Sequence, residues 1–156
     1  MAVHFCAEAY GELIASVAKQ WIGTPYRHQA SCKGVGADCL GLVRGVWRET
    51  VGPEPEATEG YSPDWAEATA EEALLDGLLR HLVPISQANV IPGDVLLFRM
   101  MERGPAKHTA ILSEGQTRDS DAEMIHAYSG HSVCTARFSL PWQRRLVAAC
   151  RFPEPV

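Results

Sequence analysis

The sequence has no long apolar run, no CxxC pair and no excess of basic residues. Its apolar stretches are short, as at residues 95–98, so we expect no membrane-spanning segment and no insertion into a membrane. The formal net charge of −5 argues against unaided binding to nucleic acid. Without a CxxC pair a structural zinc site is not expected. The N-terminus has neither a basic region nor a continuous apolar one, so no secretory signal is predicted.

The remaining composition is that of an ordinary globular protein. Hydrophobic residues make up 46% of the chain and charged residues 21%. A chain of 156 residues fits one domain, which buries roughly 70% of its unfolded surface. We therefore expect one domain over residues 1–156, with a core large enough to fold without disulfides.

Helical patterns occupy the first half of the sequence. Apolar residues recur at helical spacing over residues 5–20, and Gly23-Thr24-Pro25 ends that pattern. Asp38 stands where an N-cap belongs, before a second helix of about ten residues. Ser62 and Pro63 predict the start of a third helix that runs to about Arg80.

The second half of the sequence has strand patterns instead. These fall at residues 94–100, 108–113, 123–128, 132–138 and 146–152. Helices followed by a run of short strands predict an α+β fold, with N-terminal helices packed on an antiparallel β-sheet.

Of the five cysteines, Cys39 alone is predicted in the first turn of a helix. Unpaired backbone N–H groups and the positive end of the helix dipole stabilise a thiolate there, which predicts a lowered pKa for Cys39. We expect the other four to be mainly small buried residues, the usual fate of a free cysteine, although Cys32 lies in a polar loop. Burial is also the commonest role for Cys39 when it is considered alone.

Two histidines lie on successive predicted strands. His108 begins one strand and His126 lies within the next. A histidine in an apolar strand is usually a core residue. Neighbouring antiparallel strands can nevertheless place two imidazoles side by side, so the pair is a candidate for proton transfer.

Five sequence blocks together resemble the NlpC/P60 family of cysteine peptidases. They are Gly-Thr-Pro-Tyr-Arg at 23–27, Gly-Ala-Asp-Cys-Leu-Gly-Leu at 36–42, Pro-Gly-Asp-Val-Leu-Leu-Phe at 92–98, His-Thr-Ala-Ile at 108–111 and Ile-His-Ala at 125–127. Their order and spacing are similar to those of the family's phage-related cell-wall branch, which includes gene transfer agent tails. The resemblance extends over residues 5–152.

This resemblance implies a papain-like arrangement without a cofactor or metal. Cys39 is then the nucleophile, His108 the general base and His126 the residue that orients the base. Tyr26 matches a family tyrosine beside the nucleophile that helps bind the substrate or the oxyanion. Asp38 caps the helix and is also a candidate to meet the free amine of a peptidoglycan stem peptide. The implied reaction is hydrolysis of that stem peptide, at the γ-D-glutamyl–diaminopimelate bond.

The sequence departs from the family pattern at three places. Leu40 replaces the usual serine after the nucleophile, and His28-Gln29-Ala30 replaces the usual glycines after the tyrosine–arginine pair. The segment 114–121 is longer and more polar than a tight hairpin. These changes concern the preference for a substrate and leave the three catalytic positions intact.

Three alternatives remain open from the sequence. A lipid acyltransferase of the same superfamily would share the Cys–His chemistry, and a non-enzymatic subunit of a phage-like tail would share only the fold. A zinc hydrolase would use His108, His126 and His131 as ligands. Because no secretory signal is predicted, we expect synthesis in the cytoplasm and delivery to the periplasm or cell wall with phage-like tail or baseplate proteins.

Overall fold

The computed structural model describes residues 6–55, 73–101, 103–119 and 121–155. Helix α1 is Ala7–Lys19 and helix α2 is Cys39–Thr50, which confirms the two N-terminal helices. The expected start of the third helix at residues 62–63 lies outside the described residues. The described end of that segment is helix α4, Ala73–His81.

A six-stranded antiparallel sheet follows the helices. Its spatial order is β3-β8-β4-β5-β6-β7. The bounds are Val83–Ile85 for β3, Val95–Arg99 for β4, Ala106–Glu114 for β5, Glu123–His126 for β6, Cys134–Arg137 for β7 and Leu146–Arg151 for β8. The five predicted strands are confirmed, and so is the α+β class.

Five short elements were not predicted. Strands β1, Ser31–Cys32, and β2, Gly36–Ala37, form a small hairpin in the expected loop. The 3₁₀ helix η1 is Gln87–Asn89, and helix α5 is Leu140–Arg145. Strand β3 was missed because Pro84 weakens a strand pattern; the proline is accommodated because β3 is an edge strand.

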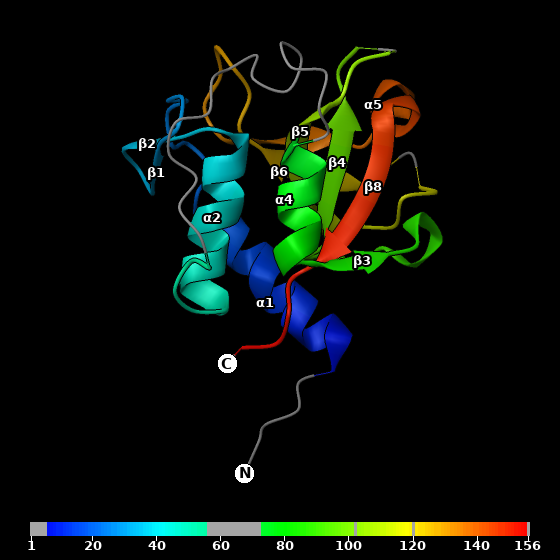
Figure 1. Cartoon of the computed structure of the whole chain (residues 1–156), viewed down its shortest axis with the longest axis horizontal. Coiled ribbons are helices and arrows are strands. Elements are labelled where there is room, and N and C mark those ends of the chain that lie inside the picture. The colour runs from blue at the N-terminus through cyan, green and yellow to red at the C-terminus, as the bar shows by residue number, and fades with distance from the viewer. Residues whose placement is uncertain (1–5, 56–72, 102, 120, 156) are drawn as a thin grey trace.

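The two faces of the large sheet pack against different elements. Alternate residues of β4 and β5, such as Val95, Leu97 and Ile111, join a buried cluster with residues of α1, α2 and α4. The residues between them, such as Phe98 and Ala110, join a second cluster that includes Trp142 of α5. Helices α1, α2 and α4 therefore cover one face and α5 covers part of the other (Figure 1).

Helices α1 and α2 come into close contact because of a glycine. A Cβ atom on Gly45 of α2 would collide with the indole ring of Trp21, which is fully buried just after α1. This close packing fixes the position of α2, and with it the position of Cys39 at its first residue.

The cysteines are less buried than expected. Cys150 is buried, Cys39 and Cys134 are half-buried, and Cys6 and Cys32 are exposed. The expectation of four buried packing thiols is therefore wrong. Cys6 does not pack in the core. It is the exposed N-cap of α1, and its sulphur accepts a hydrogen bond from the Ala9 N–H at 3.4 Å.

Among the described residues, no helix is both long enough and apolar enough to cross a membrane.

Candidate active site

The start of α2 is built around a buried carboxylate. Asp38 is only 3% exposed, and its Oδ1 accepts a hydrogen bond from the Gly41 N–H at 2.7 Å. This bond satisfies one of the unpaired donors in the first helical turn, so the capping role predicted for Asp38 is confirmed.

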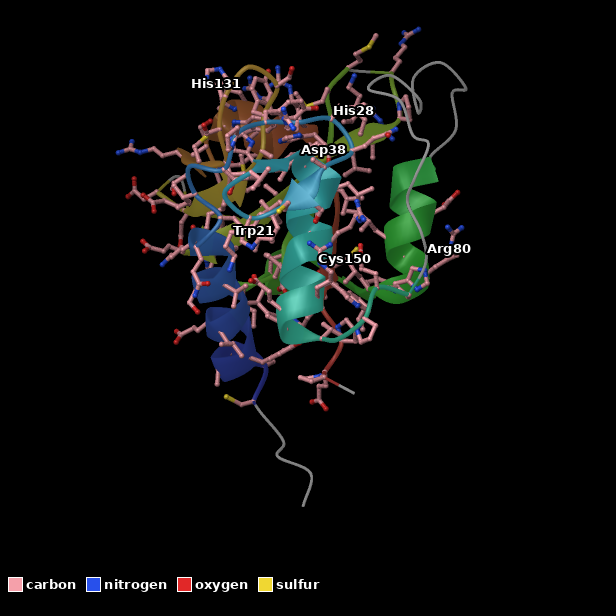
Figure 2. The ribbon with its side chains drawn as sticks, turned by 90° about the vertical axis from the view of Figure 1, so that its left-hand side faces the viewer. Trp21, His28, Asp38, Arg80, His131 and Cys150 are labelled. Carbon is pink, nitrogen blue, oxygen red and sulfur yellow. The ribbon has the colours of Figure 1, made fainter. Side chains whose placement is uncertain are left out.

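The second oxygen of Asp38 holds the loop that precedes the helix. Its Oδ2 accepts a hydrogen bond from the Gln29 N–H at 2.7 Å and lies 3.7 Å from Nδ1 of His28. Gln29 has a φ of 65°, a left-handed conformation that is unfavourable for a side-chain-bearing residue. Figure 2 shows Asp38 at the start of α2 with His28 beside it. Asp38 therefore fixes the backbone on both sides of the site.

Cys39 contacts strand β5 on both sides of His108. Its thiol donates a hydrogen bond to the carbonyl oxygen of Lys107 at 3.8 Å. The backbone carbonyl of Cys39 accepts a hydrogen bond from the Thr109 hydroxyl at 3.0 Å. Thr109 is fully buried. The helix start is thus fastened to the strand at the two residues that flank the predicted base.

His108 and His126 form a direct pair. Nε2 of His108 and Nδ1 of His126 are 2.9 Å apart, and the two side chains are 6% and 5% exposed. Strands β5 and β6 pair Ile111 with Ile125, so the same register places His126 opposite Ala110 and diagonal to His108 on one face. The side-by-side placement expected from neighbouring strands is what the structure has.

Aromatic residues that the sequence reasoning missed surround this pair. The ring centroids of Trp142 and Tyr128 lie 5.5 and 5.9 Å from that of His108. Tyr128 was detectable, because it continues the period-two alternation of β6 after His126. Trp142 was not, because it belongs to the unpredicted helix α5.

The resting thiol differs from the sequence prediction. Burial raises the pKa of Cys39, and the neighbouring Asp38 carboxylate raises it further. Hydrogen bonds from Thr109 and Leu40 act in the opposite direction without reversing the shift. The prediction of a lowered pKa is therefore wrong, because burial and an adjacent negative charge outweigh the favourable helix start.

Both imidazoles are neutral at physiological pH. Burial lowers the pKa of His108 to about 3, and the nearby His126 and Lys107 lower it as well. Burial, and then the charge of His131, lowers the pKa of His126 to about 4. The resting site consequently contains a neutral thiol and neutral imidazoles, rather than a thiolate–imidazolium pair.

Tyr26 lies in the segment between α1 and α2, which precedes the nucleophile in the chain. Its backbone forms an isolated bridge with Ala37, one residue before Asp38. Burial raises the pKa of Tyr26, and the charges of Asp38 and Cys39 raise it further. The structure therefore brings Tyr26, Asp38 and Cys39 into one neighbourhood, as expected.

His131, the third ligand of the zinc alternative, is not buried as His108 and His126 are. His131 is exposed and contacts the ring of Tyr128, at 5.7 Å between centroids. Within the described ranges, no group of three or more histidine, cysteine or acidic residues is arranged to hold a metal ion.

A helix that starts with a cysteine and packs on an antiparallel sheet with paired histidines defines a papain-like α+β fold. The sequence matches the model of the NlpC/P60 family over residues 23–151, and the chain belongs to this family. No curated protein is significantly similar to it in sequence.

Solved structures share the fold at low sequence identity. The NlpC/p60 domain of the peptidoglycan hydrolase SagA is 24% identical, with a TM-score of 0.59 over 91% of this chain and 98% of that domain. NlpC2 from Trichomonas vaginalis is 20% identical, with a TM-score of 0.64 over 96% of this chain and 50% of that protein. An NlpC/P60 family protein from Bacillus cereus ATCC 10987 is 18% identical, with a TM-score of 0.61 over 96% and 43%. The chain thus spans half or less of the latter two proteins.

Proposed function

We propose that this chain is a cysteine endopeptidase that hydrolyses the stem peptide of peptidoglycan. The observation that carries the proposal is the contact of Cys39 with Lys107 and Thr109, the two neighbours of His108. This contact places a helix-start thiol beside a strand that carries a buried imidazole pair. The substrate class is supported by membership of the NlpC/P60 family and by the shared fold with a domain of the peptidoglycan hydrolase SagA.

The reaction begins with transfer of the thiol proton. With His126 Nδ1 as acceptor, His108 carries its proton on Nε2 and has the lone pair of Nδ1 available. The Cys39 sulphur contacts the Lys107 carbonyl, and the His108 ring packs with Phe98 and Trp142. Substrate binding therefore has to bring the sulphur within hydrogen-bond distance of Nδ1 of His108. The proton moves to His108 as the sulphur attacks the scissile carbonyl. Such contacts commonly tighten only in the complex with substrate.

The rest of the cycle uses the same groups. The Cys39 N–H at the start of α2 stabilises the negative oxygen of the tetrahedral intermediate, with help from the nearby Tyr26 hydroxyl. His108 gives its proton to the leaving amine, which leaves a thioester on Cys39. A water molecule then hydrolyses the thioester, with His108 again as base, and restores the thiol.

The bond proposed to be cut is the γ-D-glutamyl–diaminopimelate bond. This assignment rests on the resemblance of the sequence blocks around Tyr26, Cys39 and His108 to those of the family. Both Asp38 oxygens accept hydrogen bonds from this chain's own N–H groups, so a substrate amine at Asp38 would have to share them.

Digestion of purified peptidoglycan and of defined muropeptides tests the proposal. Wild type should release fragments that end in D-glutamate, identified by mass, and Cys39→Ala should release none. Cys32→Ala is the matched control, because Cys32 is an exposed thiol in the preceding loop. Cleavage at a sugar linkage, at the alanine amide, or of casein alone would contradict the bond assignment. Intact peptidoglycan after wild-type treatment would favour a structural subunit that retains the fold.

We also propose that the enzyme reaches the cell wall as a component of a phage-like or gene transfer agent tail. The support is the similarity of its sequence blocks to the phage-related branch of the family. Purified tail particles should contain the chain at a fixed ratio to the tail proteins, measured by quantitative mass spectrometry. Its presence only in the particle-free fraction would contradict this delivery route.

A further inference from the structure

Trp142 of α5 touches both members of the histidine pair. Its ring centroid lies 5.5 Å from that of His108, with an interplanar angle of 31°. It lies 5.4 Å from that of His126, with an angle of 87°. One indole therefore packs partly stacked on one imidazole and edge-on against the other.

The same indole is itself held on several sides. Its centroid lies 4.9 Å from that of Phe98 on β4, in an edge-to-face contact. The guanidinium carbon of Arg145 lies 5.8 Å from the indole centroid, a cation–π distance. Gln143 of α5 donates a hydrogen bond to the carbonyl of Phe138 at 2.9 Å, which fastens the helix to the end of β7. Trp142 thus forms a wall beside the pair that is itself packed from several sides.

Such a wall has two physical effects on the pair. A histidine ring turns about two side-chain bonds, and packing on two of its sides restricts both, so the 2.9 Å bond between the rings is maintained. The indole also removes water from rings that are only 6% and 5% exposed. Exclusion of water favours the neutral imidazoles that a thiol proton requires as acceptor.

We propose that Trp142 is a positioning residue, which locks the orientation of His108 and His126 for proton transfer from Cys39. The proposal rests on the proposed peptidase function and extends it to a residue outside the Cys–His motifs. Trp142 acts through the histidine rings that it contacts.

Three variants separate this role from a general contribution to packing. Trp142→Leu removes the aromatic wall, and Trp142→Phe keeps a smaller one. Trp47→Leu is the matched control: Trp47 is also half-buried, but it packs on Phe152 and donates its indole N–H to the carbonyl of Pro53 at 3.0 Å. All three need to retain the wild-type circular dichroism spectrum.

The measurements are kcat and KM for muropeptide cleavage, together with NMR titration of the histidine rings. Trp142→Leu should lower kcat by ~10- to ~100-fold with little change in KM, because misoriented groups lose rate rather than binding. The pKa values of His108 and His126 should rise toward the ordinary imidazole value. Trp142→Phe should recover much of kcat, and Trp47→Leu should change neither quantity.

The titration does not depend on hydrolysis, so the two proposals can fail separately. Wild-type enzyme that cleaves no muropeptide refutes the peptidase function, while the imidazole titrations still decide the role of Trp142. Unchanged imidazole pKa values in Trp142→Leu refute the positioning role, whether or not the enzyme cleaves peptidoglycan. An equal loss of kcat in Trp47→Leu refutes it as well.

Discussion

Nε2 of His108 and Nδ1 of His126 lie 2.9 Å apart, and neither ring is more than 6% exposed. Two positive charges at this separation, away from water, would repel each other strongly. The pair is therefore stable only when at least one ring is neutral, and the pKa values of about 3 and about 4 make both neutral near pH 7.

The first prediction is a loss of stability in acid that originates in this pair. The folded pKa values lie below the ordinary value of 6.5, so the unfolded chain binds more protons than the folded chain between pH 6.5 and about 4. The stability from these rings is complete above pH 6.5. It decreases as the pH falls below 6.5 and is fully lost once the pH has fallen through about 4 for His126 and about 3 for His108. Within this range each ring lowers the free energy of unfolding by ~1.4 kcal/mol for every pH unit of acidification. Urea unfolding from pH 7 to pH 4 measures this slope.

A double variant isolates the histidine contribution. His108→Gln, His126→Gln removes both rings and should have a shallower slope than wild type. A double variant with the wild-type slope would assign the acid sensitivity to other groups.

The second prediction distinguishes the roles of the two histidines. His108→Ala removes the base and should lower kcat/KM by ~10²–10⁴-fold or more. His126→Ala should cost less, and His126→Asn should retain more activity than His126→Ala because an amide can still accept the His108 hydrogen bond. Steady-state kinetics on muropeptides measure kcat/KM for the three variants. Equal and complete losses of activity, accompanied by release of a bound metal, would favour the zinc alternative.

The third prediction concerns thiol alkylation without substrate. Because burial and Asp38 raise the pKa of Cys39, iodoacetamide at neutral pH should label it more slowly than the exposed Cys6 and Cys32. Its rate should increase as the pH rises toward the raised pKa. Peptide mass spectrometry at several time points measures each site, and rapid labelling of Cys39 at neutral pH would show a resting thiolate instead.

The fourth prediction is that Asp38 has separable effects on stability and on the thiol. Asp38→Ala removes the cap on Gly41 and should lower the free energy of unfolding by ~0.5–2 kcal/mol. Asp38→Asn keeps an acceptor for that bond and should lose less. Both variants remove the carboxylate charge, so the pKa of Cys39 should fall and its alkylation at neutral pH should accelerate.

Urea unfolding and alkylation rates measure the two effects, with Asp76→Asn on the exposed side of α4 as control. An unchanged Cys39 rate in Asp38→Asn would mean that the carboxylate does not influence the thiol.

Much of the fold was predictable because it depends on local patterns. The 3.6-residue period of α1, the cap at Asp38 and the alternation of β4 and β5 are properties of short segments. Strand β3 and helix α5 are defined by their packing on the sheet. Pro84 weakens the strand pattern of β3, and α5 has only 6 residues, too few to show a helical period. Tertiary contacts decided these elements.

The candidate site was likewise predictable from the sequence only in part. The identities of Cys39, His108 and His126 follow from sequence blocks that resemble the family, and the pairing of the two rings follows from neighbouring strands. The pKa of Cys39 was predicted with the wrong sign because the helix start is visible in the sequence, whereas the burial of the thiol is not. Thr109, which fastens Cys39 to β5, was missed because its role depends on a contact across 70 residues.

The separation of the nucleophile and its base along the chain has a consequence for biosynthesis. Cys39 is made early, but its fastening strand begins at Ala106 and the second imidazole comes at His126. A nascent chain shorter than this holds a thiol without an acceptor for its proton. Under the proposed mechanism, no peptidase activity arises on the ribosome until most of the polypeptide has emerged, and a prematurely terminated product is inert.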